Sequence, residues 1–379
     1  YERNDESRLG LGYLGTQVVG PRYEATVHGL DVHYGLGSGL FGLDLQLVQS
    51  DRAAETGRGC VLDVRYAASS AIQHKFEFEY FDSKVNLNDL GFLRRNNYRG
   101  GQYLLSYAYP KPGRWFQATR GTLIFRHQEN LTAGQVVDQG VFWRNTLVLK
   151  GRNTIRSAIA YLPSRYEDRN SRGNGAYKTS DRIWLNALWA TDASRPLSFS
   201  TSIGGLQEDL GDWTLNLTAG VTARLSDSLY FDLDLAYKRR TGWVVYQGGR
   251  EFGAFDAIDL QPSFDLNWFL AADHQIKFSF QWAGVKAYER QAYRVPSADG
   301  ALQRRAGAAG PRDFTVSLLT TQVRYRWEIA PLTDFYVVYN RGNQLPPTEA
   351  DAFGDLLSDA FQDPVVSSLV VKLRYRFGG

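Results

Sequence analysis

The sequence predicts an all-β protein, namely a closed antiparallel β-barrel that crosses a membrane. Apolar and polar residues alternate with a period of two along most of the chain, as in strands whose two faces meet different surroundings. Aromatic residues make up 14% of the chain, which suits the aromatic girdles of a membrane barrel. Short and long connections alternate between the expected strands, as in barrels with short periplasmic turns and long extracellular loops.

The last segment, residues 365–377, shows the alternation most clearly. One face carries Leu369, Val371, Leu373, Tyr375 and Phe377, and the other carries Lys372, Arg374 and Arg376. Successive side chains of a strand point to opposite faces, so this segment has one apolar face and one basic face. A closing strand that ends on aromatic residues resembles the assembly signal of bacterial outer-membrane barrels. We therefore expect Tyr375 and Phe377 to engage the barrel-assembly machinery.

The same pattern recurs in order from the N-terminus. After polar residues 1–7, strands are expected over residues 8–16, 23–34, 40–49, 59–67, 75–80, 213–225, 229–238, 263–270, 275–282 and 322–329. Several of these segments carry charges opposite their apolar residues, among them Asp232, Asp234, Arg324, Arg326 and Glu328. Charges are costly on a lipid-facing surface, so these side chains are expected to line the lumen.

The connections predict strand number and orientation. Long connections are expected at residues 51–58, 82–97, 127–135, 164–181, 248–257, 292–313 and 344–364, and short ones at 35–39, 68–71, 110–113, 150–153, 191–196, 226–228, 271–273 and 331–333. Counted this way, the barrel has about 18 strands, within a range of about 16 to 20. An even number of strands places both termini in the periplasm. We expect residues 1–379 to form a single outer-membrane domain.

Composition and motifs argue against other classes of protein. No run of about 18 apolar residues occurs, so no transmembrane helix is expected. The net charge of +3 is too small to indicate a nucleic-acid partner. Cys60 is the single cysteine, and the five histidines lack the spacing of metal ligands. Since no nucleophile elbow or ordered triad is found, we expect no enzyme, no metal and no cofactor.

Two sets of polar residues each allow two interpretations. The basic lumen residues can form an anion-selective constriction, or they can pair with lumen carboxylates such as Asp232, Asp234 and Asp265. Residues 348–362 carry Asp351, Asp355 and Asp359 four positions apart with apolar residues between them, which predicts a short amphipathic helix. This helix is either a lid or plug over the extracellular mouth, or a cap on the rim of the barrel.

Three stretches indicate a family. They are residues 28–36, residues 323–342, and the loop 81–101 with Leu90, Gly91, Phe92, Leu93, Arg94 and Arg95 at its centre. They resemble a family of outer-membrane barrels of undescribed activity, in which the barrel commonly follows a family-9-like carbohydrate-binding domain. That domain is absent from these residues, and the chain does not begin with Met. We therefore expect a processed chain with a further N-terminal part.

Two functions are compatible with these features. A barrel of about 16–18 strands can enclose an aqueous channel, which indicates a pore or gated channel for small polar solutes. Alternatively, the barrel is a non-conducting membrane anchor or assembly platform, either for the N-terminal carbohydrate-binding domain or for a partner protein at the surface or in the periplasm. The family resemblance favours this alternative. In either case, outer-membrane lipids and lipopolysaccharide are expected to surround the barrel.

Overall fold

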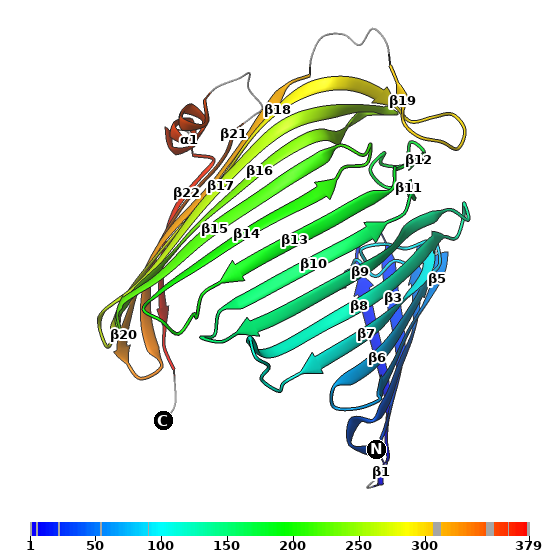
Figure 1. Cartoon of the computed structure of the whole chain (residues 1–379), viewed down its shortest axis with the longest axis horizontal. Coiled ribbons are helices and arrows are strands. Elements are labelled where there is room, and N and C mark those ends of the chain that lie inside the picture. The colour runs from blue at the N-terminus through cyan, green and yellow to red at the C-terminus, as the bar shows by residue number, and fades with distance from the viewer. Residues whose placement is uncertain are drawn as a thin grey trace. The chain divides into compact units, whose positions relative to one another are not determined.

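The chain is built almost entirely of strands (Figure 1). The computed structural model describes residues 2–4, 7–21, 23–53, 55–89, 91–305, 312–345, 352–362 and 364–376. The strands form a 20-stranded sheet and a separate two-stranded sheet, so the all-β prediction is confirmed and the strand number lies within the predicted range. Among the described residues, no helix is both long enough and apolar enough to span a membrane.

The first of two compact units comprises Tyr1–Leu147, Ala158–Ile183 and Ala298–Ala301. Its strands are β1 (Glu2–Asn4), β2 (Ser7–Val19), β3 (Glu24–Leu36), β4 (Phe41–Arg52), β5 (Glu55–Ala67), β6 (Ile72–Phe81), β7 (Tyr98–Tyr109), β8 (Phe116–Asn130), most of β9 (Val136–Leu149), β11 (Tyr166–Glu167) and β12 (Tyr177–Lys178). A short 3-10 helix, η1 (Gly37–Gly39), joins β3 to β4. Each strand from β2 to β7 pairs antiparallel with the next.

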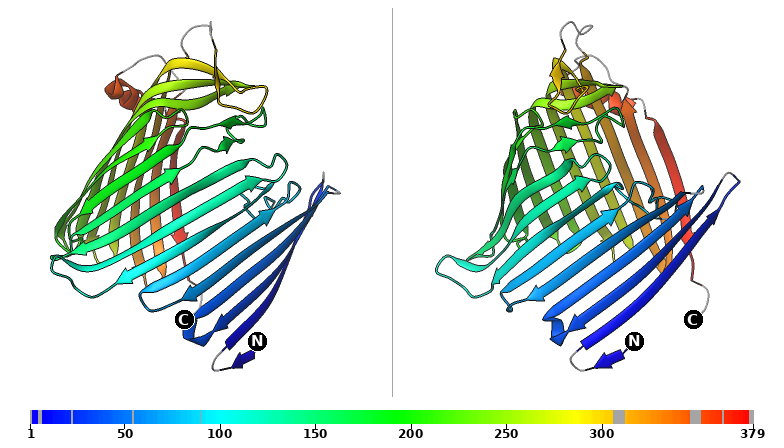
Figure 2. Two further views of the ribbon diagram at one scale, coloured as in Figure 1. Left: turned by 45° about the vertical axis from the view of Figure 1, so that its right-hand side comes forward. Right: turned by 90° about the vertical axis from the view of Figure 1, so that its right-hand side faces the viewer.

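The second unit comprises Val148–Ser157, Trp184–Ser297 and Leu302–Gly379, and β10 (Thr154–Leu162) contributes to both units. Its elements are β13 (Arg182–Ala190), β14 (Leu197–Gln207), β15 (Trp213–Ser226), β16 (Leu229–Gly248), β17 (Glu251–Ala271), β18 (His274–Arg294), β19 (Gln303–Arg304), β20 (Phe314–Ala330), β21 (Thr333–Leu345), α1 (Phe353–Gln362) and β22 (Val366–Arg374). Consecutive long strands pair in antiparallel order from β13 to β22. Within this unit the colour therefore changes steadily from one strand to the next (Figure 2).

Alternation gives the strands of the second unit one apolar and one polar face. The register places Leu217 of β15 opposite Tyr237 of β16, whereas Thr218 lies opposite Ala236 on the other face. Large exposed side chains on the apolar face include Leu215, Leu217, Leu233, Leu235, Val323, Trp327, Leu369, Val371 and Leu373. An exposed apolar surface of this extent indicates contact with lipid or with another protein.

Strands β16, β17 and β18 are longer than the alternation predicted. They contain 20, 21 and 21 residues, about twice the 9–11 residues that a membrane-crossing strand needs. The prediction of a long connection at residues 248–257 is therefore wrong, because β17 already begins at Glu251. Packing supports the extra length, because Phe252 and Phe255 are completely buried there, and Phe255 packs against Phe314 with ring centroids 5.1 Å apart.

The structure contradicts the prediction that the sheet closes into a barrel. Among the described residues, β22 pairs only with β21, and β2 pairs with β3 and with the three-residue strand β1. The sheet is therefore not closed, and each outer edge retains backbone groups without a ladder partner. The period of two specifies which side of a strand is apolar, but it does not specify which strands meet at a seam. A single domain spanning residues 1–379 stays a prediction.

The assignment of faces can be tested with neighbouring substitutions in β15. Leu217→Arg places a charge on the apolar face and is expected to cost roughly 2–4 kcal/mol of folding free energy if Leu217 lies near the middle of the membrane. Thr218→Arg, on the polar face, is expected to have a mild effect. Both free energies can be measured by reversible urea unfolding in lipid vesicles. Equal losses for the two variants would show that the faces are assigned wrongly.

Candidate functional site

The polar face of the first unit carries a row of charged and amide side chains that crosses consecutive strands. In register, the row contains His33, Asp44, Asp63, Glu77, Gln102 and Arg126. Lys75 donates to Glu77 and lies 3.1 Å from Asp63. Arg126 donates two hydrogen bonds of 3.2 and 3.1 Å to the Gln102 side-chain oxygen. Opposite charges in this row therefore neutralise one another, as in a solvated lining of mixed charge.

The long loop 163–181 is attached to this same polar face. Arg126 lies 3.3 Å from Asp138 on β9, which places Asp138 in the charged row. On its other side, Asp138 lies 3.5 Å from the guanidinium of Arg165 at the start of the loop. The Arg165 guanidinium also donates a hydrogen bond of 2.7 Å to the carbonyl oxygen of Val137. The loop therefore begins over the polar face rather than over the apolar one.

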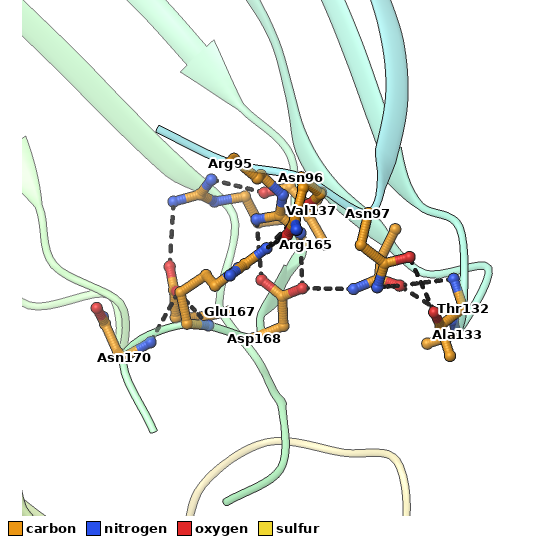
Figure 3. Close-up of polar contacts among 12 residues, drawn as sticks. Arg95, Asn96, Asn97, Thr132, Ala133, Val137, Arg165, Glu167, Asp168 and Asn170 are labelled. Carbon is orange, nitrogen blue, oxygen red and sulfur yellow. Dashed lines mark hydrogen bonds and ion pairs between the residues drawn. The ribbon is translucent and has the colours of Figure 1, made fainter. Parts of the chain in front are cut away.

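A cluster of four side chains then joins three loops, and Figure 3 labels three of them, Arg95, Asn97 and Asp168. We call this cluster of Arg95, Asn97, Asn130 and Asp168 the loop clamp. Arg95 donates to both carboxylate oxygens of Asp168, at 3.0 and 2.6 Å. Asn130 donates a third hydrogen bond to Asp168, at 2.6 Å. Two parallel bonds between a guanidinium and a carboxylate fix orientation as well as distance, so loops 82–97 and 163–181 are held in one arrangement.

Neighbouring contacts extend the loop clamp. Asn97 donates to the Asn130 side-chain oxygen at 3.2 Å and accepts a bond of 2.8 Å from the Thr132 hydroxyl. Arg169 donates to the carbonyl oxygen of Asn96 at 2.9 Å. Asn97 has a φ of 60°, a left-handed conformation that Asn tolerates better than most residues. The turn between β8 and β9 is thereby tied to both long loops.

Local structure explains why loop 82–97 presents Arg95 to Asp168. The Asp82 carboxylate accepts hydrogen bonds from the backbone of Lys84 and Val85, at 2.9 and 2.8 Å, so the chain turns immediately after β6. Val85 is buried with Phe81 and Tyr98. The loop thus has its own small apolar core, which holds its second half beside the turn that follows β8.

The electrostatic state of Asp168 follows from its surroundings. Burial opposes ionisation of this carboxyl, but the hydrogen bonds from Arg95 and Asn130 and the charge of Arg95 outweigh burial and hold its pKa below the usual range. Asp168 is therefore ionised at neutral pH, and the loop clamp contains a charge-assisted ion pair. The Arg95 and Asp168 side chains are only 19% and 12% exposed, so solvent screens this pair weakly.

The structure gives two of the predicted lumen arginines a carboxylate that the sequence analysis did not identify. Arg326 lies 2.7 Å and Arg374 3.2 Å from the buried carboxylate of Asp334. Arg326 is also 2.9 Å from Glu328. The sequence did not predict Asp334 as a lumen residue, because it directly follows the expected turn 331–333. Its register opposite Glu328 and Arg374 would have indicated that it lies on the polar face.

The other predicted lumen residues form two separate groups on the polar face of the second unit. Asp232 lies opposite Asp265 across β16 and β17, and Asp234 lies opposite Ser263. Within the described residues, Arg324 and Lys372 take part in no ion pair, and Arg376 is exposed. The acidic group on β16 and β17 is therefore not the partner of the basic group on β20 and β22.

Helix α1 packs on the apolar face of the second unit, next to β18, β20 and β21 (Figure 1). Leu356 and Ala360 are buried against Trp282 and Leu319. Leu319 has the same parity on β20 as Val323 and Trp327, which belong to the exposed apolar surface. The helix is therefore not a lid or plug over the polar face, and its position agrees with the alternative of a helix at the rim. Asp351 lies outside the described residues.

Polar contacts fix α1 in this position. The Ser317 hydroxyl accepts a bond from the Trp282 indole and donates one to the carbonyl oxygen of Leu356, both at 2.9 Å. Near the C-terminal end, Asn343 donates to the carbonyl oxygen of Ala360 at 3.2 Å, and Arg341 donates to that of Phe361. Asn343 and Arg341 thus satisfy carbonyl groups that the end of a helix leaves unpaired.

The predicted loop motif and assembly signal are only partly described. Arg95 belongs to the loop clamp, the Gly91 amide donates to the carbonyl oxygen of Leu87 at 2.8 Å, and Phe92 is 84% exposed. The neighbouring Arg94 is exposed. Tyr375 is also exposed, whereas Leu90 and Phe377 lie outside the described residues.

The strength of the loop clamp can be measured with Arg95→Gln. This change leaves the Asp168 charge without its guanidinium and is expected to cost about 1–3 kcal/mol of local stability. Amide hydrogen exchange of residues 96–97 and 168–170 is therefore expected to accelerate by about five-fold or more. The control is Arg290→Gln, because Arg290 is half exposed and 3.3 Å from Asp212. Wild-type exchange rates in Arg95→Gln would contradict the importance of the clamp.

Comparison with solved structures shows the fold. A crystal structure of the ferric enterobactin receptor (PfeA) in complex with BCV-L6 aligns with a TM-score of 0.50 and 7% identity, covering 97% of this chain and 73% of that chain. A mutant of the same receptor from Pseudomonas aeruginosa aligns with a TM-score of 0.48 and 7% identity, covering 97% and 72%. On the first of these alignments, the fold of this chain resembles that of an outer-membrane receptor barrel.

Comparison with protein sequences gives the family. No curated protein matches this chain. The family model described as "Domain of unknown function (DUF5916)" matches residues 19–377. Since this match covers almost the whole length, the chain belongs to that family.

Proposed function

We propose that the chain is a gated pore of the bacterial outer membrane for small polar solutes, and that it acts without catalysing a reaction. The observation that carries the proposal is the position of loop 163–181. Arg165 attaches this loop to the charged row through Asp138, and Asp168 fastens it to Arg95. A loop held over a polar, charge-lined face can narrow a channel, and a clamp made of one ion pair can be released.

The polar face of the second unit supports selectivity. Asp232, Asp234 and Asp265 lie on β16 and β17, whereas Arg324 and Lys372 lie on β20 and β22 with no ion pair among the described residues. Such an arrangement orients dipolar solutes, and the two cations favour anions near β20 and β22.

The alternative function is a non-conducting anchor or assembly platform. The close packing of loop 163–181 favours the anchor, because Ser171 and Tyr177 in this loop are fully buried. A rigid loop surface of this kind can carry a partner protein or a carbohydrate-binding domain instead of opening. Conductance separates the two functions.

The proposed orientation places both termini in the periplasm and the long loops outside the cell, with lipopolysaccharide around the barrel and assembly through the barrel-assembly machinery. After Cys60→Ser, a cysteine at Phe92 is expected to react with an impermeant maleimide on intact cells, because Phe92 is exposed in loop 82–97. A cysteine at Asp227, in the turn between β15 and β16, is expected to react only after permeabilisation. The opposite labelling pattern would reverse the orientation.

Single-channel recording in a planar bilayer tests the pore. The wild-type protein is expected to give stable ohmic currents, and Arg95→Gln is expected to increase the open fraction because it weakens the loop clamp. The double variant Arg324→Glu with Lys372→Glu is expected to shift selectivity towards cations, and Arg290→Gln serves as the control. Folded protein without conductance, in both the wild type and Arg95→Gln, would exclude the pore and leave the anchor.

A further inference from the structure

The apolar face of the first unit contains a groove of about 670 Å³ across β6, β7, β8 and β9. The register places Phe76 opposite Tyr103 and Tyr103 opposite Phe125, so the three rings lie on one face. Phe76 and Phe125 are 45% and 44% exposed. Gln102 and Arg126 also line the groove, but their side chains bond one another in the charged row on the opposite face. The aromatic rings of the groove thus lie on the face opposite the proposed channel lining.

Glycine residues form part of the groove, so backbone replaces side chains there. A β-carbon at Gly101 would lie 2.8 Å from the carbonyl oxygen of Glu77 and 3.8 Å from the Phe76 ring. This position has no room for a side chain. The result is an apolar depression between aromatic rings, whose volume can hold part of a hydrocarbon chain.

The groove is polar at one end only. Arg99 and His127 lie there, at the end of the strands nearest the long loops, and both contact Glu129, at 3.0 and 3.1 Å. The Arg99 and His127 side chains remain 60% and 54% exposed. Arg99 and His127 thus surround a single carboxylate, and the exposed part of the Arg99 guanidinium is free to donate hydrogen bonds to an anionic headgroup.

We propose that this groove binds an acyl chain of a phosphorylated outer-leaflet lipid, with a lipid phosphate at Arg99 and His127. The proposal rests on the outer-membrane placement proposed above, but not on conduction. Apolar walls continuous with a lipid-facing surface bind the chain, and the polar end at the loop side matches the level of lipid headgroups in that orientation.

Native mass spectrometry of the folded protein in detergent, with lipid A as the probe and phosphatidylcholine as the comparison, tests the site. Val141→Trp adds bulk at a lining position that is 38% exposed, and it is expected to weaken lipid A binding at least about ten-fold, equivalent to about two buried methylene groups. Arg99→Gln is expected to weaken binding of lipid A more than binding of phosphatidylcholine, because the choline group compensates the phosphate charge of phosphatidylcholine. Leu233→Trp, on the apolar face of β16, is the control and is expected to bind as the wild type.

Equal binding by the wild type, Val141→Trp and Leu233→Trp would overturn the groove as a lipid site. Unchanged preference for lipid A in Arg99→Gln would overturn recognition of the phosphate. Lipid counts are independent of current through a bilayer, so a non-conducting protein can still bind lipid A in this groove, and a conducting one can fail to do so.

Discussion

The fold depends on the requirement that each strand between the two outer edges satisfies its backbone hydrogen bonds through its neighbours while its two faces meet different media. In hydrocarbon no water can replace a missing partner, so strands must pair in continuous ladders. The antiparallel registers from β13 to β22 meet this requirement hairpin by hairpin. The side-chain period of two then places Leu217 on one face and Thr218 on the other.

The same separation of faces organises the charges. In the first unit, Lys75 lies between Asp63 and Glu77, and neighbouring strands extend this pairing. Charges on adjacent strands are close enough to neutralise one another, so the polar face does not carry a strong field of one sign. In the second unit, Asp334 performs this role for Arg326 and Arg374, while the carboxylates of β16 and β17 remain apart from them.

The loops and the helix use the faces that the strands provide. Loop 163–181 is attached on the polar side through Arg165, and α1 is attached on the apolar side through Trp282 and Leu319. An amphipathic helix must bury its apolar side, and the extended upper part of β18 and β20 offers a surface for it. The groove beside Gly101 shows that the absence of a side chain also shapes the apolar face.

The sequence by itself determined the class of the fold, most strand positions and the side to which each strand residue points, because these depend on a local period of two. It also identified the amphipathic helix and Arg95. Only the tertiary structure paired Arg95 with Asp168, 73 residues away, and Arg326 with a carboxylate beyond the turn. It likewise decided that α1 lies on the apolar face, that β17 begins at Glu251, and that the sheet is not closed. These features depend on contacts between distant segments, and a local pattern does not specify such contacts.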